Sequence, residues 1–323
     1  MKVLLVRLSS MGDLIHTLPA IEDLARLRPD VELHWLCEAG FADIARLHPF
    51  VKRVHTLRWR QWRKQLGKTA TWQAMASLRR DLQHERYDWV LDSQGLIKSA
   101  AFAKMAHAPV KGLNSRSARE GAAAWFYQQS FEVQKGQNAV LRNRLLFAQA
   151  FAYELPHLLQ FGVQVPESGR LADVAQVYHV ALHATSRDSK LWRQDYWLDL
   201  MQRLHQRDGS TIYLPWGNAA EKARAEAMAA QLSFVEVCPA MNLLQAAWLL
   251  QHAQSVIGVD TGLLHLANAL AKPLVGIYTD TDPHKTGVQT SAIAQNIGGK
   301  AQMPTVDEVY ALLMRCMAAA DEQ

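Results

Sequence analysis

The chain alternates between short apolar runs and longer stretches in which apolar residues recur every three or four positions. The short runs are rich in Val, Ile and Leu, which is typical of buried parallel strands, and the longer stretches have the period of amphipathic helices. Strands and helices that alternate in this way predict an α/β protein with parallel sheets. The predicted strands lie at residues 2–8, 31–37, 51–57, 89–92, 109–112, 178–183, 211–214, 234–237, 256–259 and 274–278.

The alternation stops once and begins again, which predicts two domains. The break falls at residues 155–176, where two prolines and two glycines are typical of a linker. A chain of 323 residues is also too long for one small core. We therefore expect one doubly wound domain at residues 1–154 and a second at 177–323.

Charge is distributed unevenly between the two halves. Residues 1–150 carry 23 Lys and Arg against 13 Asp and Glu, a net charge of +10, whereas residues 151–323 carry 12 against 17, a net charge of −5. The first half is therefore expected to meet an anionic partner. In residues 58–68, five basic residues are interleaved with Trp59 and Trp62. This run suits a membrane surface, a phosphorylated amphiphile or nucleic acid, and a plain solvated face is the alternative.

Cysteine usage and hydropathy predict a soluble protein from a reducing compartment. Cys37, Cys238 and Cys316 share no metal-binding or redox spacing, and their odd number argues against a disulfide framework. Residues 237–259 form an uncharged run long enough to span a bilayer, but its proline, asparagine, histidine and three glutamines are too polar for that. The N-terminus has no signal-peptide layout.

The turn after the first predicted strand carries a candidate catalytic carboxylate. Residues 9–13 lack both the three-glycine dinucleotide fingerprint and the phosphate-loop lysine, which disfavours a nicotinamide enzyme or an NTPase. Asp13 stands where a helix begins, and an ordinary helix cap is the alternative interpretation.

A second turn, Asp260-Thr261-Gly262, lies between a buried strand and a helix. Free N–H groups at such a helix start, at the carboxyl edge of a parallel sheet, bind phosphates in α/β proteins. Thr261 and His265 are four residues apart and so share one face of the helix. An ordinary turn with a histidine in the core is the alternative.

Two further loops of the second half carry polar residues. Thr185, Ser186 and Lys190 follow a predicted strand, where two hydroxyls and an ammonium could gather around a diphosphate. Glu221 lies one turn into a later helix, where its carboxylate could accept hydrogen bonds from ribose hydroxyls. A solvated loop and a glutamate that complements the helix dipole are the alternatives.

Four motifs stand at these predicted turns: Ser9-Ser10-Met11-Gly12-Asp13, His183-Ala184-Thr185-Ser186-Arg187, Leu214-Pro215-Trp216-Gly217 and Val259-Asp260-Thr261-Gly262-Leu263-Leu264-His265. In this order they resemble the motifs of the lipopolysaccharide heptosyltransferases, most nearly those of type I, over essentially the whole chain. The resemblance implies the GT-B fold, in which two doubly wound Rossmann-like domains face a cleft. The heptosyltransferases of type II, which add the second inner-core heptose, are the nearest alternative.

The resemblance implies an inverting, metal-independent glycosyltransferase without a cofactor. It would move L-glycero-D-manno-heptose from ADP-heptose to the Kdo of Kdo–lipid A, in the synthesis of the lipopolysaccharide inner core of a Gram-negative cell. The enzyme would be cytoplasmic and peripheral on the anionic inner face of the inner membrane. Nucleic acid is not an expected partner.

Site residues follow from the same resemblance. Asp13 corresponds to the family's catalytic base. Basic residues that correspond to the family's acceptor-binding set are Arg60, Arg63, Lys64 and Arg119. Residues that correspond to the donor-binding set are Thr185, Ser186, Lys190, Glu221, Met241, Asp260, Thr261, Gly262 and His265.

One loop departs from the family pattern. Residues 279–283 read Thr-Asp-Thr-Asp-Pro, where the family usually has Gly-Pro-Thr-Asp-Pro. Asp280 and Asp282 thereby form the Asp-x-Asp metal signature of another glycosyltransferase class. Because Lys190 can neutralise the donor phosphates, we interpret the two aspartates as part of a surface loop and expect no metal there.

Two classes of protein compete with this interpretation. A non-catalytic nucleic-acid binder would explain the basic run with its tryptophans but not the acidic second half. A nucleotide-sugar epimerase of similar architecture would explain both domains but has no need of the basic run.

Overall fold

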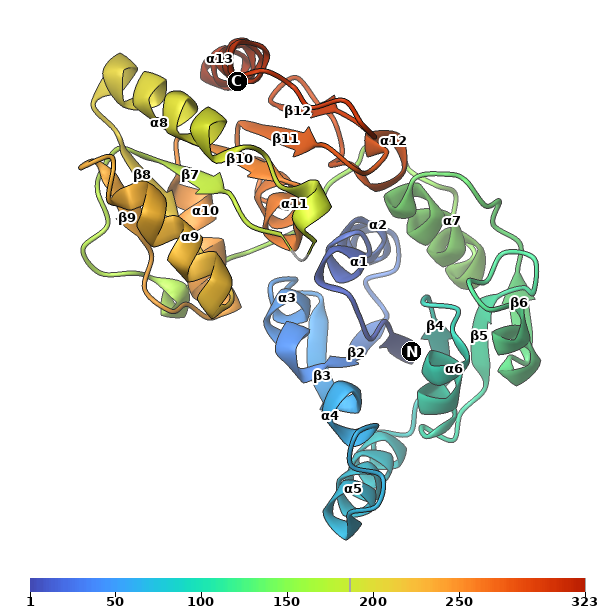
Figure 1. Ribbon diagram of the computed structural model, residues 1–323. Helices are drawn as coiled ribbons and strands as arrows, with labels where there is room; N and C mark the ends of the chain where they lie inside the picture. Colours follow the sequence, from blue (N-terminus) through green and yellow to red (C-terminus); the bar gives the residue numbers. More distant parts are fainter. Residues whose placement is uncertain (186, 323) are drawn as a thin grey trace. The chain divides into compact units, whose positions relative to one another are not determined.

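The computed structural model describes residues 1–185 and 187–322, and it divides into two compact units, Met1–Gln164 and Val165–Gln323. The predicted donor residue Ser186 lies outside the described residues. Each unit contains one sheet of six strands with helices around it (Figure 1). The α/β fold class predicted from the alternating pattern is confirmed.

The sheet of the first unit has the strand order β3-β2-β1-β4-β5-β6, and all neighbours are parallel. Its strands are β1 (Lys2–Val6), β2 (Glu32–Glu38), β3 (Val51–Leu57), β4 (Trp89–Asp92), β5 (Val110–Leu113) and β6 (Gln129–Phe131). Its helices are α1 (Met11–Ile15), α2 (Leu18–Leu27), η1 (Ala39–Phe41), α3 (Ala42–Arg46), α4 (Trp59–Trp62), α5 (Thr69–His84), α6 (Ile97–Lys104), η2 (Gly121–Phe126) and α7 (Ala139–Phe151).

The sheet of the second unit has the order β12-β11-β10-β7-β8-β9 and is also parallel throughout. Its strands are β7 (Tyr178–Leu182), β8 (Thr211–Leu214), β9 (Val235–Val237), β10 (Ser255–Val259), β11 (Leu274–Tyr278) and β12 (Ala294–Gly298). Its helices are η3 (Glu167–Gly169), η4 (Asp188–Lys190), α8 (Gln194–Asp208), α9 (Ala219–Ala229), α10 (Leu243–His252), α11 (Gly262–Ala269), α12 (Pro283–Thr286) and α13 (Val306–Asp321).

Both sheets have one topology, in which the first three strands run outward on one side and the next three on the other. The strand order therefore reverses between β1 and β4 in the first unit and between β7 and β10 in the second. Open α/β sheets bind their ligands outside the carboxyl ends of the strands at such a reversal. The topology thus marks one candidate site in each unit.

The core of the first unit lies on both faces of its sheet. Leu4 and Val6 of β1 pack with Leu78 of α5 and Phe102 of α6. Because side chains alternate along a strand, Leu5 points to the other face, where it is fully buried as well. The sheet is therefore covered on both faces, which is why its strands are apolar runs rather than alternating ones.

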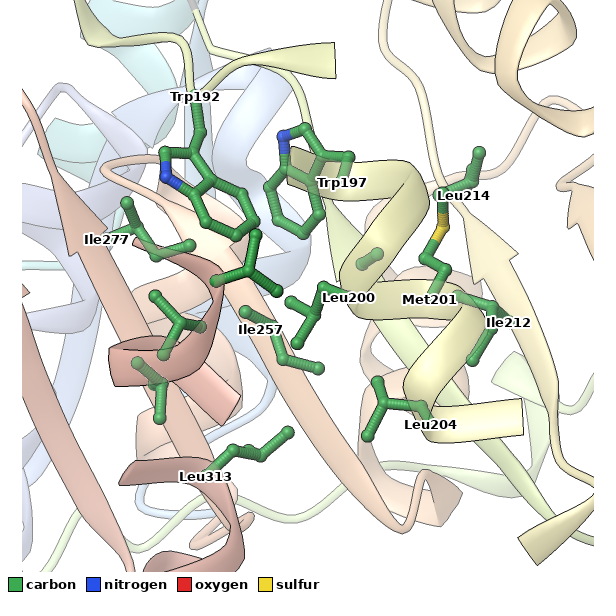
Figure 2. Packing of buried hydrophobic residues seen from close by; sticks show 14 of the residues in the cluster. Trp192, Trp197, Leu200, Met201, Leu204, Ile212, Leu214, Ile257, Ile277 and Leu313 are labelled. Carbon is green, nitrogen blue, oxygen red and sulfur yellow. The ribbon is translucent and has the colours of Figure 1, made fainter. Parts of the chain in front are cut away.

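The core of the second unit is seen in Figure 2, where α8 packs over the strands. Trp192 and Trp197 meet edge to face, with ring centroids 5.0 Å apart. Both tryptophans are buried with Leu200 and Ile257, and the Trp192 indole N–H donates to the Pro304 carbonyl at 2.9 Å. This contact joins the loop before α8 to the loop before α13.

Residues 11–27, whose apolar positions recur with helical spacing, form two helices in the structure. α1 ends at Ile15 and α2 begins at Leu18, with Pro19 in its first turn. Proline is tolerated in the first turn of a helix but removes a hydrogen bond from a helix interior. The proline thus explains why a second helix begins there.

The stretch 155–176, expected to be a linker, contains the boundary between the units. Its parts pack on their own units: the Gln164 N–H donates to the Leu47 carbonyl at 2.8 Å, and Gly169 lies against Leu244 of α10. Among the described residues, no helix is both long and apolar enough to cross a membrane.

Candidate functional site

Asp13 lies in the first turn of α1, just beyond the carboxyl end of β1. The Ser10 N–H donates to its Oδ2 at 2.9 Å, and Arg7 Nη2 donates to its Oδ1 at 3.2 Å. Arg119 Nη1 is 3.8 Å from Oδ2. Burial works against ionisation, but Arg7, the Ser10 N–H and Arg119 outweigh it, and the pKa of Asp13 is lowered. Its side chain remains 18% exposed, so a carboxylate at neutral pH is open to a ligand.

The turn after β4 fixes the loop that carries Asp13. Gln94 accepts a hydrogen bond from the Leu8 N–H at 2.7 Å through its amide oxygen and donates to the Ser9 carbonyl at 3.1 Å. Arg7 donates to the Ser93 carbonyl. Since β1 and β4 are neighbours, these bonds join the two strand ends at the reversal of strand order and hold the Asp13 loop in place.

The pocket at Asp13 is lined by three arginines and two side-chain amides besides the carboxylate. The lining residues that bear on the chemistry are Arg7, Asp13, Gln94, Arg119, Arg142 and Asn143. Arg142 Nη2 is bound to the Ser117 carbonyl at 2.7 Å, and the Asn143 amide nitrogen to the His16 carbonyl at 3.0 Å. A carboxylate among fixed cations suits a hydroxylated, anionic ligand.

Of this set, the sequence resemblance identified Asp13 and Arg119 and missed Arg7, Arg142 and Asn143. A signal existed for Arg7, because an arginine directly follows the apolar strand β1. None existed for Arg142 and Asn143, since both are brought to the pocket by the long helix α7.

The predicted acceptor residues Arg60, Arg63 and Lys64 lie on and after α4, and all three are exposed. α4 follows the carboxyl end of β3, so it stands at the same edge of the sheet as Asp13. The Arg60 guanidinium lies over the Phe41 ring, 5.2 Å from its centroid. The structure places these basic side chains in solvent at the edge where the predicted base lies.

The tryptophans of the basic run are structural. Trp62 is 8% exposed and Trp59 is partly buried. Their rings pack on Phe102 of α6, with centroids 5.6 Å away for Trp59 and 6.5 Å for Trp62. The interleaving of aromatic and basic residues therefore reflects a short helix with a buried and a charged face.

In the second unit, Asp260 is the centre of a polar cluster at the end of β10. Lys190 Nζ donates to its Oδ2 at 2.6 Å, and the Thr281 hydroxyl donates to the same oxygen at 2.8 Å. The Thr185 hydroxyl donates to the Asp260 carbonyl at 2.9 Å. The loops after β7, β10 and β11 thus meet here, at the second reversal of strand order. Thr281 was missed by the sequence analysis.

α11 begins beside this cluster. Thr261 is its N-cap in an extended conformation, with no capping bond from its side chain, and Gly262 is its first residue. His265 is 6% exposed, with Nε2 3.9 Å from Asp260 Oδ1. N–H groups of a first helical turn have no partner within the helix, and together with Lys190 they form a place for a phosphate.

Gly258 explains how α11 approaches the sheet so closely. A Cβ at this position of β10 would lie 2.8 Å from the Leu182 Cβ and 3.2 Å from a methyl of Leu264 on α11. Glycine leaves room for Leu264 to pack directly on the strand, which brings the start of α11 to the Asp260 cluster.

Glu221 and Met241 stand at neighbouring loops of the second unit. Glu221 lies in the first turn of α9, where its Oε2 accepts a hydrogen bond from the Gly217 N–H at 2.7 Å. The buried His183 ring donates from Nε2 to the Glu221 carbonyl at 3.2 Å, which ties the loop after β7 to α9. Met241 is partly exposed just before α10.

The two aspartates of the Asp-x-Asp loop have separate partners. Asp280 accepts a hydrogen bond from the Ser189 hydroxyl at 2.6 Å. Asp282 caps α12 by accepting from the His284 N–H at 3.0 Å, and its other oxygen is 3.7 Å from Lys285. Each carboxylate thus has a local structural role in the loop.

In the described part of the chain, one group of side chains has the spacing of metal ligands: His34, His55 and Glu85 of the first unit. The Tyr87 hydroxyl lies 2.9 Å from a ring nitrogen of each histidine. Glu85 already binds Lys2 at 3.0 Å. The Tyr87 hydroxyl lies between the two histidine rings, and Lys2 occupies the Glu85 carboxylate. We therefore interpret the group as a hydrogen-bonded cluster and not as a metal site.

The chain was compared with known proteins. A family model described as glycosyltransferase family 9 (heptosyltransferase) matches residues 75–313. Lipopolysaccharide heptosyltransferase 1 of Pseudomonas aeruginosa is 42% identical over 289 residues, which cover 89% of this chain and 81% of the relative. The enzyme of the same name from Escherichia coli K12 is 40% identical, with 89% of this chain and 90% of the relative covered. The chain belongs to glycosyltransferase family 9.

Solved structures agree with this membership. E. coli heptosyltransferase WaaC with ADP matches with a TM-score of 0.90 and 37% identity, covering 97% of this chain and 99% of that one. The present chain is thus a heptosyltransferase with the GT-B fold, as the motifs predicted. It acts in lipopolysaccharide biosynthesis. A UDP-N-acetylglucosamine 2-epimerase from Listeria monocytogenes, at 12% identity and a TM-score of 0.56 over 99% of this chain and 90% of that one, shares the fold alone.

Proposed function

We propose that this heptosyltransferase moves L-glycero-D-manno-heptose from ADP-heptose to a Kdo hydroxyl of Kdo–lipid A, with inversion at the anomeric carbon and without a metal. The observation that carries the proposal is Asp13, a partly exposed carboxylate that Arg7, the Ser10 N–H and Arg119 keep ionised. Relatives named heptosyltransferase 1, at 39–42% identity, favour type I over type II.

In the proposed mechanism, Asp13 accepts the proton of the Kdo hydroxyl while that oxygen forms a bond to the anomeric carbon. The bond from this carbon to the β-phosphate oxygen breaks, and its electron pair leaves with ADP. Because the Asp13 pKa is lowered, the group stays a carboxylate and is ready to accept a proton throughout the neutral range.

We assign the donor to the second unit. Lys190 and the start of α11 would take the diphosphate, where negative charge accumulates as ADP leaves. Thr185, Asp260 and His265 would hold this region in shape, and Glu221 and Met241 would meet the ribose and the adenine. Support comes from the convergence of Lys190, Thr185 and the α11 start on one cluster, and from structures of the related WaaC with ADP and with an ADP-2-deoxy-2-fluoro heptose.

We assign the acceptor to the first unit. Arg119 would meet the Kdo carboxylate beside Asp13, and the exposed Arg60, Arg63 and Lys64 would meet lipid phosphates at the same sheet edge. The net charge of +10 in residues 1–150 supports this, as well as a peripheral position on an anionic membrane surface.

An assay of ADP release tests the proposed function. The protein is mixed with ADP-heptose and Kdo–lipid A, each alone and both together, and ADP and the heptosylated lipid are quantified. We expect both products only when both substrates are present. Release of ADP without a heptosylated lipid, or transfer only to a lipid that already carries one heptose, would contradict the type I assignment.

A further inference from the structure

The first unit has an apolar hollow of about 550 Å³ that the proposed chemistry does not use. Its walls come from α4, α5, α6 and the residues beside them. The wall residues that matter here are Trp59, Met75, Ile97, Ala101, Phe102 and Met105. Ile97 is 45% exposed, so apolar surface at the hollow faces water, and a hollow of this kind marks a binding site for an apolar group.

The hollow adjoins the Asp13 pocket. Ser93 and Gln94 line the pocket, and Leu96 and Ile97, two and three residues further along the same turn, line the hollow. The loop before η2 repeats this arrangement, because Arg119 lines the pocket and Glu120 lines the hollow. A molecule that presents a hydroxyl to Asp13 therefore has its remaining part within reach of the hollow.

Charges beside the hollow favour an anionic amphiphile. Trp59 of the wall belongs to α4, whose exposed basic residues follow directly in the chain, and Lys98 lies in the wall itself. The Glu120 carboxylate has a partner of its own, because it accepts a hydrogen bond from the Ile97 N–H at the start of α6, at 2.7 Å. An apolar cavity beside cations matches a lipid that carries phosphates next to its acyl chains.

We propose that the hollow receives an acyl chain of the acceptor lipid while its sugar meets Asp13. The proposal rests on the proposed function, and it adds a determinant of acceptor specificity, because an acylated acceptor gains contacts that the sugar alone lacks. Burial of two methylenes of the chain raises the affinity by roughly tenfold.

Two substitutions of the same kind test this role. Ala101→Glu places a carboxylate in the hollow on an exposed face of α6, and Ala76→Glu places one on an exposed face of α5 outside the hollow. Both variants are assayed with the acylated acceptor and with the same acceptor stripped of its acyl chains. We expect Ala101→Glu to raise the KM for the acylated acceptor about tenfold over Ala76→Glu, and both variants to use the stripped acceptor as the wild type does.

Other outcomes overturn the proposal in distinguishable ways. Equal KM values for the acylated acceptor in both variants would show that the hollow takes no chain, although the proposed function would stand. If the Ala101→Glu variant no longer binds phosphatidylglycerol vesicles that contain no acceptor, the hollow takes bulk membrane lipid and not the acceptor. Absence of transfer to either acceptor by the wild type would refute the proposed function itself.

Discussion

Asp13 owes its proposed role to its neighbours. A carboxylate at a helix start is often only a cap, and Asp13 does bond to the Ser10 N–H as a cap would. Arg7 and Arg119 distinguish it, because two cations hold its pKa down although it is largely buried. A cap would need neither a guanidinium from the end of β1 nor one from a loop more than 100 residues away.

Replacing Asp13 by asparagine should abolish turnover. The amide keeps the shape of the side chain but cannot accept the proton, so kcat should fall by roughly 10²–10⁴-fold. The affinity for ADP-heptose should be unchanged, since we assign the donor to the second unit. Calorimetric titration with the donor, together with the ADP-release assay, measures both quantities.

Asp43→Asn is the matched control, because Asp43 also lies in a first helical turn and pairs with an arginine, Arg46, at 2.8 Å. It should retain the wild-type rate. The pH profile adds a second check: a lowered Asp13 pKa means that the carboxylate is still charged as the pH falls from 8 to 6, so the wild-type kcat should show no acid limb in that window. More than half of the wild-type turnover in Asp13→Asn would exclude Asp13 as the base.

Lys190 should bind the donor phosphates in place of a metal. Its ammonium lies 2.6 Å from Asp260 next to the start of α11, and a hydrogen bond to a charged group contributes about 1.5–3 kcal/mol. Lys190→Ala should therefore weaken ADP binding by roughly 10- to 100-fold and lower kcat as well. EDTA should leave the wild-type rate unchanged.

Lys285→Ala is the control for loss of a lysine, because Lys285 is exposed and pairs only loosely with Asp282. It should bind ADP as the wild type does. If EDTA abolishes activity and Mg²⁺ or Mn²⁺ restores it, Asp280 and Asp282 are metal ligands. The assignment of the donor phosphates to Lys190 is then wrong.

At the scale of elements, the apolar pattern predicted ten strands to within two residues at each end and missed β6 and β12, one edge strand of each sheet. β3, β4, β8 and β11 have the predicted bounds. β6 (Gln129–Phe131) and β12 (Ala294–Gly298) were not predicted, because β6 has only three residues and β12 has polar residues in its middle. β6 and β12 are recognised by their pairing with β5 and β11, which composition does not reveal.

The same limit applies to the sites. Single motifs at strand ends were visible in the sequence, because parallel strands place their carboxyl ends at one edge. Which residues meet there was not visible: Lys190 and Asp260 are 70 residues apart, and Arg7 reaches Ser93 across 86. The strand order brings these distant residues together. The sequence indicates that order only through its resemblance to a family of known fold.

At the scale of the whole molecule, two units of one topology carry opposite net charges. The basic first unit contains the proposed base and acceptor groups, and the acidic second unit contains the proposed donor groups. Each unit has a core of its own, so the stability of each should depend on its own buried contacts.

The ion pair of Arg144 and Asp23 should be a main determinant of the stability of the first unit. Arg144 of α7 binds Asp23 of α2 through two hydrogen bonds, of 2.6 and 3.1 Å, and also binds the carbonyls of Pro156 and Leu158. The two side chains are 5% and 2% exposed. Arg144→Met leaves a buried carboxylate without its partner, and such a loss costs about 3–5 kcal/mol.

Arg203 of the second unit is the matched control, because it pairs with Asp199 and Asp307 at the surface, where an ion pair contributes about 0–1 kcal/mol. Urea unfolding followed by circular dichroism should show an early transition in Arg144→Met and a nearly unchanged curve in Arg203→Met. Adding Asp23→Leu to Arg144→Met should restore part of the lost stability, since it removes the buried carboxylate that has no partner. Equal destabilisation by the two arginine variants would mean that the buried pair does not support the first unit, and that its stability comes from apolar packing of α2 on α7.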